Sequence, residues 1–235
     1  MAQLISSVIG HKKQLQQLAD TIKSGRLPNS YLFVGPAGIG KKKVAEVVAQ
    51  ALLCEGPAGG VACGFCSSCI RVSKGQHERL LVVSPGGEGG KSSSQMIKIE
   101  QSREAIKFLS LRLESKQSRV VIIDEAEKLN PQAANALLKS IEEPPEGSYF
   151  ILVANSSSSI LPTIRSRSQA MRFSPLKPEE LKQVIQVEDW VVASAQGSVE
   201  LAEQISSEDF LKLILNQEYK VHYFRDISSS TKKLF

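Results

Sequence analysis

The sequence predicts an α/β fold in which helices cover both faces of a parallel sheet. Four segments read as continuous apolar runs of strand length, and amphipathic helical patterns separate them. Parallel strands are buried on both faces, so they show such runs instead of alternating polar and apolar residues. A glycine-rich segment between the first run and the next helix is a third indication, because strand, glycine loop and helix together form a phosphate-binding unit.

Periodicity and helix-end signals place the individual elements along the chain. A first helix is expected where Leu15, Leu18 and Ile22 recur at helical spacing before Gly25. Asn130 can cap a helix that begins with proline, because its side chain accepts hydrogen bonds from the first turn. The predicted strands are 31–34, 80–83, 119–124 and 149–155, and the predicted helices between them cover 41–53, the region around 96–113, and 131–143.

A change in composition near Pro175 and Pro178 predicts a second, smaller unit. Residues 1–175 should form the α/β domain, with a cysteine-rich module at about 54–69, and residues 176–235 a small helical domain with a C-terminal segment. The last stretch, 222–235, shows no strong periodicity. Residues 84–94 contain a Gly-Lys-Ser triplet but lack the leading glycine of a phosphate motif, so a surface loop is the better interpretation.

Composition and charge exclude several classes of protein. The chain has 235 residues, of which 42% are hydrophobic and 23% charged, so neither disorder nor a fibrous class fits. A formal charge of +5 is compatible with contact to nucleic acid or an acidic partner but indicates neither. No segment resembles an export signal or a membrane span, so we expect a cytoplasmic protein without membrane contact, whose four cysteines are reduced.

The glycine-rich segment lacks one part of a complete phosphate-binding loop. In the motif G-x-x-x-x-G-K-[ST], glycines let backbone N–H groups wrap phosphates, the lysine reaches their outer oxygens, and the hydroxyl binds magnesium. The first two parts are provided by Gly35, Gly38, Gly40 and Lys41. Lys42 replaces the hydroxyl with an ammonium, which has no lone pair for a cation, although its flexible stem could swing the charge away.

Asp124 and Glu125 end an apolar strand, and in phosphoryl-transfer proteins such a pair holds magnesium and polarises the attacking water. Alone, the pair would be read as a strand end that turns into solvent. Beside the glycine loop it becomes a candidate nucleotide site, together with Asn155 at the end of the next strand. Binding of ATP stays open, because Lys41 and the glycine amides could hold phosphates without metal. Hydrolysis is not expected, since Mg²⁺ lacks a ligand.

Cys54, Cys63, Cys66 and Cys69 are all the cysteines of the chain, at the spacing C-x8-C-x2-C-x2-C. A C-x2-C step brings two sulfurs toward one ion, and four thiolates suit tetrahedral zinc. Unliganded buried thiols would leave the clustering unexplained, and a redox pair is disfavoured because two further cysteines complete a closed site. A site with four protein ligands has no open position for substrate, so the predicted zinc is structural.

Arg165 and Arg167 follow the last predicted strand and are separated by one serine. Arginine is planar and permanently charged, and near a phosphate it can stabilise the transition state of transfer, also from a neighbouring subunit. From this segment alone, a solvated pair of arginines is the preferred interpretation.

The ordered segments "VIGHKKQL", "GPAGIGKKK", the four-cysteine insert, "VVIIDEAEKLNPQAANALLKSIEEPP" and "LPTIRSRS" resemble the AAA+ subunits of the bacterial DNA polymerase III clamp loader. The resemblance covers most of the first two-thirds of the chain and implies an AAA+ fold with a zinc-binding insert and a small helical lid domain. Within that family the chain is similar to delta-prime subunits more than to gamma/tau motor subunits. Motor subunits carry threonine or serine at the position of Lys42, and an arginine after a lid "GS" pair that Val199 and Glu200 follow here.

The resemblance also implies a role for Arg167. It occupies the arginine of the family's "SRC" motif, in which Ser168 replaces the cysteine, and is implied to act in trans on the ATP of an adjacent motor subunit. Implied partners are gamma/tau and delta subunits, the sliding clamp, and primed DNA through the assembly. The lid segment is shorter than usual, and the residues after Glu208 are too few for the family's third, collar domain.

The expected function is that of a non-motor, delta-prime-like clamp-loader subunit without ATPase activity of its own. One alternative is an active gamma/tau-like ATPase, which Lys41, Asp124 and Glu125 favour. Another is a zinc-dependent nucleic-acid-binding protein. The cysteine insert, however, holds few basic or aromatic residues besides Phe65 and Arg71, so no surface for stacking bases or tracking phosphates is evident.

Overall fold

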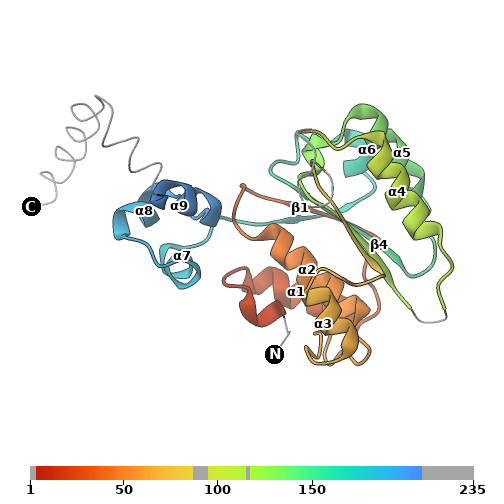
Figure 1. Cartoon of the computed structure of the whole chain (residues 1–235), viewed down its shortest axis with the longest axis horizontal. Helices are drawn as coiled ribbons and strands as arrows, with labels where there is room; N and C mark the ends of the chain where they lie inside the picture. Colours follow the sequence, from red (N-terminus) through yellow and green to blue (C-terminus); the bar gives the residue numbers. More distant parts are fainter. Residues whose placement is uncertain (1–3, 87–94, 115–116, 208–235) are drawn as a thin grey trace, which may run out of the picture.

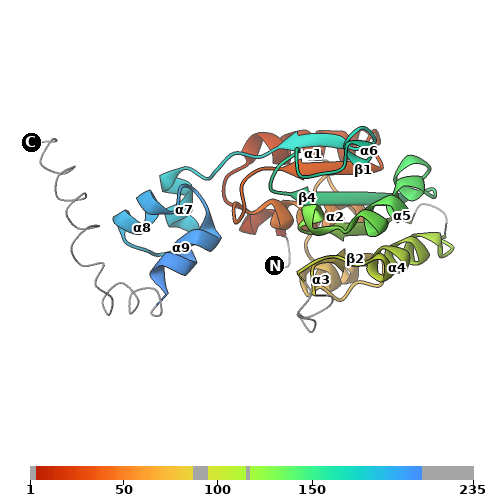
Figure 2. The same ribbon diagram turned by 90° about the horizontal axis from the view of Figure 1, so that it is seen from above.

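Five parallel strands form one sheet in the order β2-β3-β4-β1-β5 in the computed structural model (Figures 1 and 2). The structure describes residues 4–86, 95–114 and 117–207. The strands are β1 (Ser30–Val34), β2 (Leu80–Val83), β3 (Arg119–Ile123), β4 (Ser148–Ala154) and β5 (Gln169–Arg172). The α-helices are α1 (Lys12–Lys23), α2 (Lys41–Leu53), α3 (Ser67–Ser73), α4 (Ile99–Ser110), α5 (Pro131–Glu142), α6 (Pro162–Arg165), α7 (Pro178–Val184), α8 (Asp189–Ser194) and α9 (Val199–Ser206), and the 3₁₀ helices are η1 (Leu4–Ser7) and η3 (Ala126–Lys128).

Alternate side chains of the central strands enter two separate cores. In β3, Val120 and Ile122 pack into the core on one face, whereas Val121 and Ile123 pack into the core on the other. Residues of α1 and α2 complete the first core, and residues of α4 and α5 complete the second. Figure 1 shows these two pairs of helices on opposite sides of the sheet. Every residue of β3 is buried, so the expected parallel sheet with covered faces is confirmed.

Helix α5 begins where the capping residue in the sequence predicts it to begin. The Asn130 side chain accepts a hydrogen bond from the Ala133 N–H at 2.7 Å, and Pro131 is the first residue of α5. Helix α2 has the predicted bounds, whereas α4 is shorter than the pattern around 96–113.

Strand β5 and helix α3 are among the elements that the sequence analysis did not predict. Strand β5 contains only one buried residue, Met171, so it lacks the apolar run that indicated the other strands. Helix α3 lies within the cysteine-rich segment, where the spacing of the cysteines predicts a metal site but does not predict a helix.

Helices α7, α8 and α9 pack around a core of their own, which contains Leu181, Val191, Val192 and Ala202. Figure 1 shows this helical unit beside the α/β part, beyond the end of β5. The boundary at residue 175 stays a prediction.

Two segments singled out in the sequence lie largely outside the described residues. These are the glycine-rich loop at 84–94, described only to residue 86, and the chain after residue 207, including the stretch 222–235. Among the described helices, none combines the length and apolar character that a bilayer crossing requires.

Candidate functional site

The glycine loop, the acidic pair and Asn155 meet at one edge of the sheet. The loop follows β1, the acidic pair follows β3, and Asn155 follows β4, so all three leave the carboxyl ends of adjacent parallel strands. The Gly35 N–H donates a hydrogen bond to the Ala154 carbonyl at 3.3 Å, which joins two of these segments directly. Gly38 and Gly40 have φ angles of 69° and 92°, which L side chains rarely adopt. The fold therefore brings the glycine loop, the acidic pair and Asn155 together.

The Lys41 ammonium is turned back onto the glycine loop. It donates hydrogen bonds to the carbonyls of Gly35, at 2.7 Å, and Pro36, and to the Asn155 side-chain oxygen at 3.3 Å. Burial lowers the pKa of Lys41, while the carboxylates of Glu127, Asp124 and Glu200 act in the opposite direction. An ammonium has three N–H donors, and three acceptors of the protein itself engage them here.

Lys42 does not swing away from the acidic pair. Its ammonium lies 3.1 Å from an Asp124 carboxylate oxygen, and the exposed fractions of the two side chains are 45% and 18%. The flexible stem could have carried this charge elsewhere, but in the structure it does not. Opposite charges at this distance attract each other. The expected magnesium ligand is therefore engaged by a resident cation.

Glu125 has a left-handed backbone, with φ of 50°, and an exposed side chain. Its N–H donates to the Asp124 carboxylate at 3.2 Å. Partial burial, followed by the negative charges of Asp124 and Glu127, raises the pKa of Glu125. Non-glycine residues rarely adopt this conformation, and where they do, the surrounding structure must hold them there.

The helical unit contacts the glycine loop, which the sequence analysis did not foresee. The Val199 N–H donates to the Gly38 carbonyl at 2.8 Å, and a Cβ atom on Gly38 would lie 2.3 Å from the Ser198 hydroxyl oxygen and 2.6 Å from the Glu200 Cβ. Gly38 therefore permits a close approach of α9 as well as the loop's own turn. On the other side, the His11 Nε2–H donates to the Ile39 carbonyl at 2.7 Å.

The four cysteines form one compact cluster of free thiols. Their sulfur atoms all lie within 4.8 Å of one another, with 4.0 Å between Cys54 and Cys66 and 3.9 Å between Cys63 and Cys69. A tetrahedral ion with metal–sulfur bonds of about 2.3 Å requires sulfurs about 3.8 Å apart. The cluster could therefore hold a metal ion with little rearrangement.

Backbone N–H groups point at these sulfurs. The amides of Cys63, Cys66 and Cys69 donate to the sulfurs of Cys54, Cys63 and Cys66, at 3.3, 3.4 and 3.4 Å. Such bonds, chiefly from Phe65 and Cys66, lower the pKa of Cys63 to about 6, whereas burial raises the pKa of Cys69. Donors aimed at sulfur stabilise a thiolate, which is the form that binds metals.

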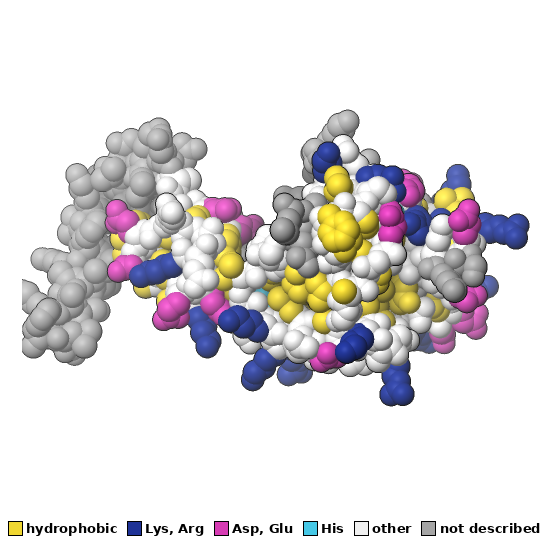
Figure 3. Space-filling model, turned by 90° about the horizontal axis from the view of Figure 1, so that it is seen from below, with side chains coloured by type: hydrophobic (Ala, Val, Ile, Leu, Met, Phe, Trp, Pro, Cys, Tyr) yellow, Lys and Arg dark blue, Asp and Glu magenta, His cyan; other side chains and the backbone are white. Residues whose placement is uncertain are grey.

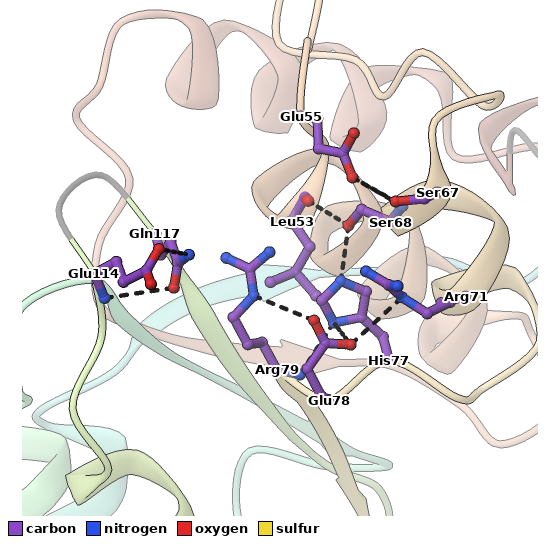
Figure 4. A network of polar contacts seen from close by, with 10 residues as sticks. All are labelled: Leu53, Glu55, Ser67, Ser68, Arg71, His77, Glu78, Arg79, Glu114 and Gln117. Carbon is purple, nitrogen blue, oxygen red and sulfur yellow. Dashed lines mark hydrogen bonds and ion pairs between the residues drawn. The ribbon is translucent and has the colours of Figure 1, made fainter.

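A buried polar network supports the cysteine cluster (Figure 4). The Ser68 hydroxyl donates to the Leu53 carbonyl and accepts from His77 Nε2 at 2.8 Å, while His77 Nδ1 accepts from the Arg79 N–H at 3.0 Å. Leu53 precedes Cys54 and Ser68 precedes Cys69, so one hydroxyl joins the two sequence segments that hold the ligands. Burial lowers the pKa of His77, which keeps the ring neutral as this pattern requires.

Arg167 lies at the amino ends of the strands, which is the opposite edge of the sheet from the glycine loop at their carboxyl ends. The neighbouring Ser168 hydroxyl is 2.8 Å from the hydroxyl of Ser30, which begins β1, whereas Gly35 follows the last residue of β1. Five residues of strand span about 16 Å. That distance exceeds the length of an arginine side chain, so Arg167 cannot reach the phosphate loop of its own chain. Its guanidinium pairs with Glu142 at 3.0 Å.

The charged side chains on one face of the molecule are mixed in sign. On the face drawn in Figure 3, Lys and Arg side chains are spread along the edges with acidic side chains between them, instead of forming one basic patch. In the cysteine module, Phe65 is 78% exposed, and the Arg71 guanidinium pairs with Glu78 at 3.4 Å.

Solved structures of AAA+ proteins share this fold. A gamma subunit-related DNA polymerase III protein of Thermotoga maritima has a TM-score of 0.55 at 20% identity, with 86% of this chain and 62% of that chain covered. The RuvB Holliday junction branch migration motor of the same organism has a TM-score of 0.51 at 19% identity, with 84% and 60% covered. The chain therefore has an AAA+ fold, as its sequence predicted.

The chain belongs to the family described as "DNA polymerase III, delta subunit", whose sequence model matches residues 10–177. It is 39% identical to DNA polymerase III subunit delta' of Pseudomonas aeruginosa over 139 residues, which are 59% of this chain and 41% of that protein. It is 34% identical to subunit delta' of Bacillus subtilis over 169 residues, 72% and 49% of the two chains. Subunit tau of Escherichia coli is 29% identical over 180 residues, 77% and 27%. The chain thus spans less than half the length of these relatives, and the predicted resemblance to delta-prime and gamma/tau is confirmed.

Removing one thiol should release the metal ion from the cysteine cluster. We expect the purified protein to carry one metal ion per chain by elemental analysis, and Cys66→Ser to carry far less, because three thiolates leave the tetrahedral site incomplete. Phe65→Ala, next to Cys66 but 78% exposed, is the control and should keep its metal. A metal-free parent protein would contradict the assignment.

Removing the Ser68 hydroxyl should destabilise the fold. Ser68→Ala leaves the buried His77 N–H and the Leu53 carbonyl without this partner, so the free energy of unfolding in urea should fall by about 1–3 kcal/mol. Ser73→Ala removes an exposed hydroxyl from the same helix and should change it by less than about 0.5 kcal/mol. Equal effects of the two substitutions would show that the buried network contributes nothing specific.

Proposed function

We propose that this protein is a non-hydrolysing, delta-prime-like subunit of a DNA polymerase III clamp loader, and that Arg167 completes the ATP site of a neighbouring gamma/tau subunit. The ion pair between Lys42 and Asp124 is the observation that carries the first half of the proposal. The position of Arg167, at the sheet edge away from its own glycine loop, supports the second half. The assembly would load the sliding clamp at primed DNA, with a delta subunit as a further partner.

Without a hydroxyl at position 42, magnesium at the glycine loop would lose one ligand and meet a positive charge. The ammonium already neutralises Asp124, so a dication would have to displace it and then lie near it. Lys41 is engaged by three acceptors of the protein, which a phosphate would also have to replace. We propose that any nucleotide bound at Gly35, Gly38, Gly40 and Lys41 binds without magnesium and is not hydrolysed.

We propose that the four cysteines hold zinc in a structural role. Their donor set is four sulfurs within 4.8 Å of one another, and all four ligands come from the protein, which leaves no position for substrate. When bound, zinc would cross-link the end of α2 to the start of α3. We also propose residues 1–175 as the AAA+ domain and residues 176–235 as the region that contains the lid.

Substituting Arg167 tests the trans role. In a loader reconstituted with gamma/tau and delta subunits, Arg167→Ala should lower ATP hydrolysis at the adjacent site by a factor of about 10³ or more, as is typical for arginine fingers. The total clamp- and DNA-stimulated ATPase rate of the loader would then fall by the amount that the adjacent site contributes to it. Arg165→Ala, which removes a guanidinium two residues away, is the matched control and should stay within about twofold. Undiminished turnover with Arg167→Ala would reject the trans role.

Restoring a hydroxyl at position 42 tests the blocked metal site. In calorimetric titrations of the purified chain with ATP, magnesium should not strengthen binding to the parent protein. It should strengthen binding to Lys42→Thr by about tenfold, or about 1.4 kcal/mol, because the substitution adds a ligand and frees Asp124. Lys43→Thr is the control, since Lys43 pairs with Glu46 at 3.8 Å instead of Asp124. Magnesium-dependent hydrolysis by the parent chain, abolished by Asp124→Asn, would favour a gamma/tau-like ATPase.

A further inference from the structure

The Arg167 side chain is held in one orientation by acceptors on two of its edges. Its Nε donates to Glu142 Oε2 at 3.0 Å and its Nη2 to Glu142 Oε1 at 3.4 Å, so the carboxylate binds the guanidinium side-on. Its Nη1 donates to the Thr163 carbonyl at 3.1 Å and lies 3.5 Å from the Ser166 hydroxyl. The acceptors come from the end of α5 and from the α6 segment, which precedes Arg167 directly.

This pattern leaves donor capacity at the far end of the guanidinium. Arginine has five N–H groups, and each terminal nitrogen carries two of them. Nη2 uses one for Glu142 and keeps a second, which has no partner among the described residues. Because Glu142 takes the side-on edge, the remaining Nη2 donor points along the axis of the side chain, the direction in which an arginine meets a phosphate end-on.

Arg167 and Glu142 line an open groove of about 380 Å³ at the amino edge of the sheet. Asn29 and Ser30 at the start of β1, together with Ser168, form other parts of its wall. Arg167 is 35% exposed in its side chain and Glu142 55%, so both are accessible from solvent. An approaching anion would therefore find the guanidinium already aligned at the surface.

An exposed ion pair of this kind contributes little to the stability of a fold, and stability is therefore a weak explanation for Glu142. Its effect on the arginine is larger, since a long side chain with many rotamers is restricted before any ligand arrives. A group that acts in a transition state works best when its orientation does not have to be established at that moment.

We propose that Glu142 is a positioning residue for Arg167: it holds the guanidinium side-on, so that its terminal N–H groups face the phosphates of a neighbouring subunit's nucleotide. This inference rests on the proposed function, since it assumes that Arg167 acts in trans. Glu142 itself touches neither nucleotide nor metal in this scheme. It acts through the conformation of Arg167 alone.

A double-mutant cycle in the reconstituted loader tests the inference. Arg167→Ala should decrease the maximal ATPase rate, and Glu142→Ala should cause at least half of that decrease. Glu142→Ala should leave the KM for ATP unchanged. Glu142→Gln keeps one acceptor for Nε, so its maximal rate should lie between those of the parent loader and Glu142→Ala. In the Arg167→Ala background, Glu142→Ala should cause no further loss. Glu143→Ala removes an exposed carboxylate one residue away and is the matched control.

The outcomes separate this inference from the proposed function. If Arg167→Ala lowers turnover but Glu142→Ala does not, or if Glu142→Ala raises it, the positioning role is overturned and the trans role of Arg167 stands. A loss with Glu142→Ala that persists in the Arg167→Ala background also overturns it. If Arg167→Ala itself has no effect, the proposed function fails. Each isolated variant should unfold at the same temperature as the parent protein. An unchanged unfolding temperature shows that a loss of ATPase turnover does not come from misfolding.

Discussion

The five strands of the sheet all run in the same direction, and this constraint separates two groups of side chains. Segments that follow the strands, with the glycine loop, Asp124 and Asn155, gather at one edge. Arg167 precedes β5 and therefore lies at the other edge. A chain built this way cannot bring its own arginine to its own phosphate loop. The proposed trans role of Arg167 fits this arrangement, because the two edges can face different neighbours.

At the carboxyl edge, the polar groups of the site satisfy one another. Lys41 is bound by loop carbonyls and Asn155, Lys42 is paired with Asp124, and the Gly38 carbonyl accepts from Val199 of the helical unit. In a site built for nucleotide, these groups would be directed at phosphate and metal. Here a ligand would have to break existing contacts before it could bind.

The cysteine cluster is connected to the remainder of the fold through buried groups. Cys69 shares a small core with Ala51 and Ala62, and the Gln50 side chain donates to the Cys69 carbonyl at 3.0 Å. Helix α2 also follows the glycine loop directly. The altered phosphate loop therefore lies at the first residue of this helix, and the first cysteine of the cluster lies directly after its last residue. A metal ion in the cluster would therefore stabilise the end of the helix that is remote from the phosphate loop.

The amino-acid sequence by itself determined which apolar runs form four of the five strands, the cap of α5 at Asn130, the glycine loop with its altered position 42, and the cysteine cluster. Each of these depends on residues close together along the chain. Only the tertiary structure decided the partners of Lys42, Arg167 and Ser68, the contact of α9 with Gly38, and the position of β5. These depend on residues far apart in sequence that packing brings within hydrogen-bonding distance, and flexible charged side chains carry no local pattern that names the partner they will find. Strand β5 was missed for a related reason: an edge strand with one buried residue takes its structure from pairing with β1 and not from its own composition.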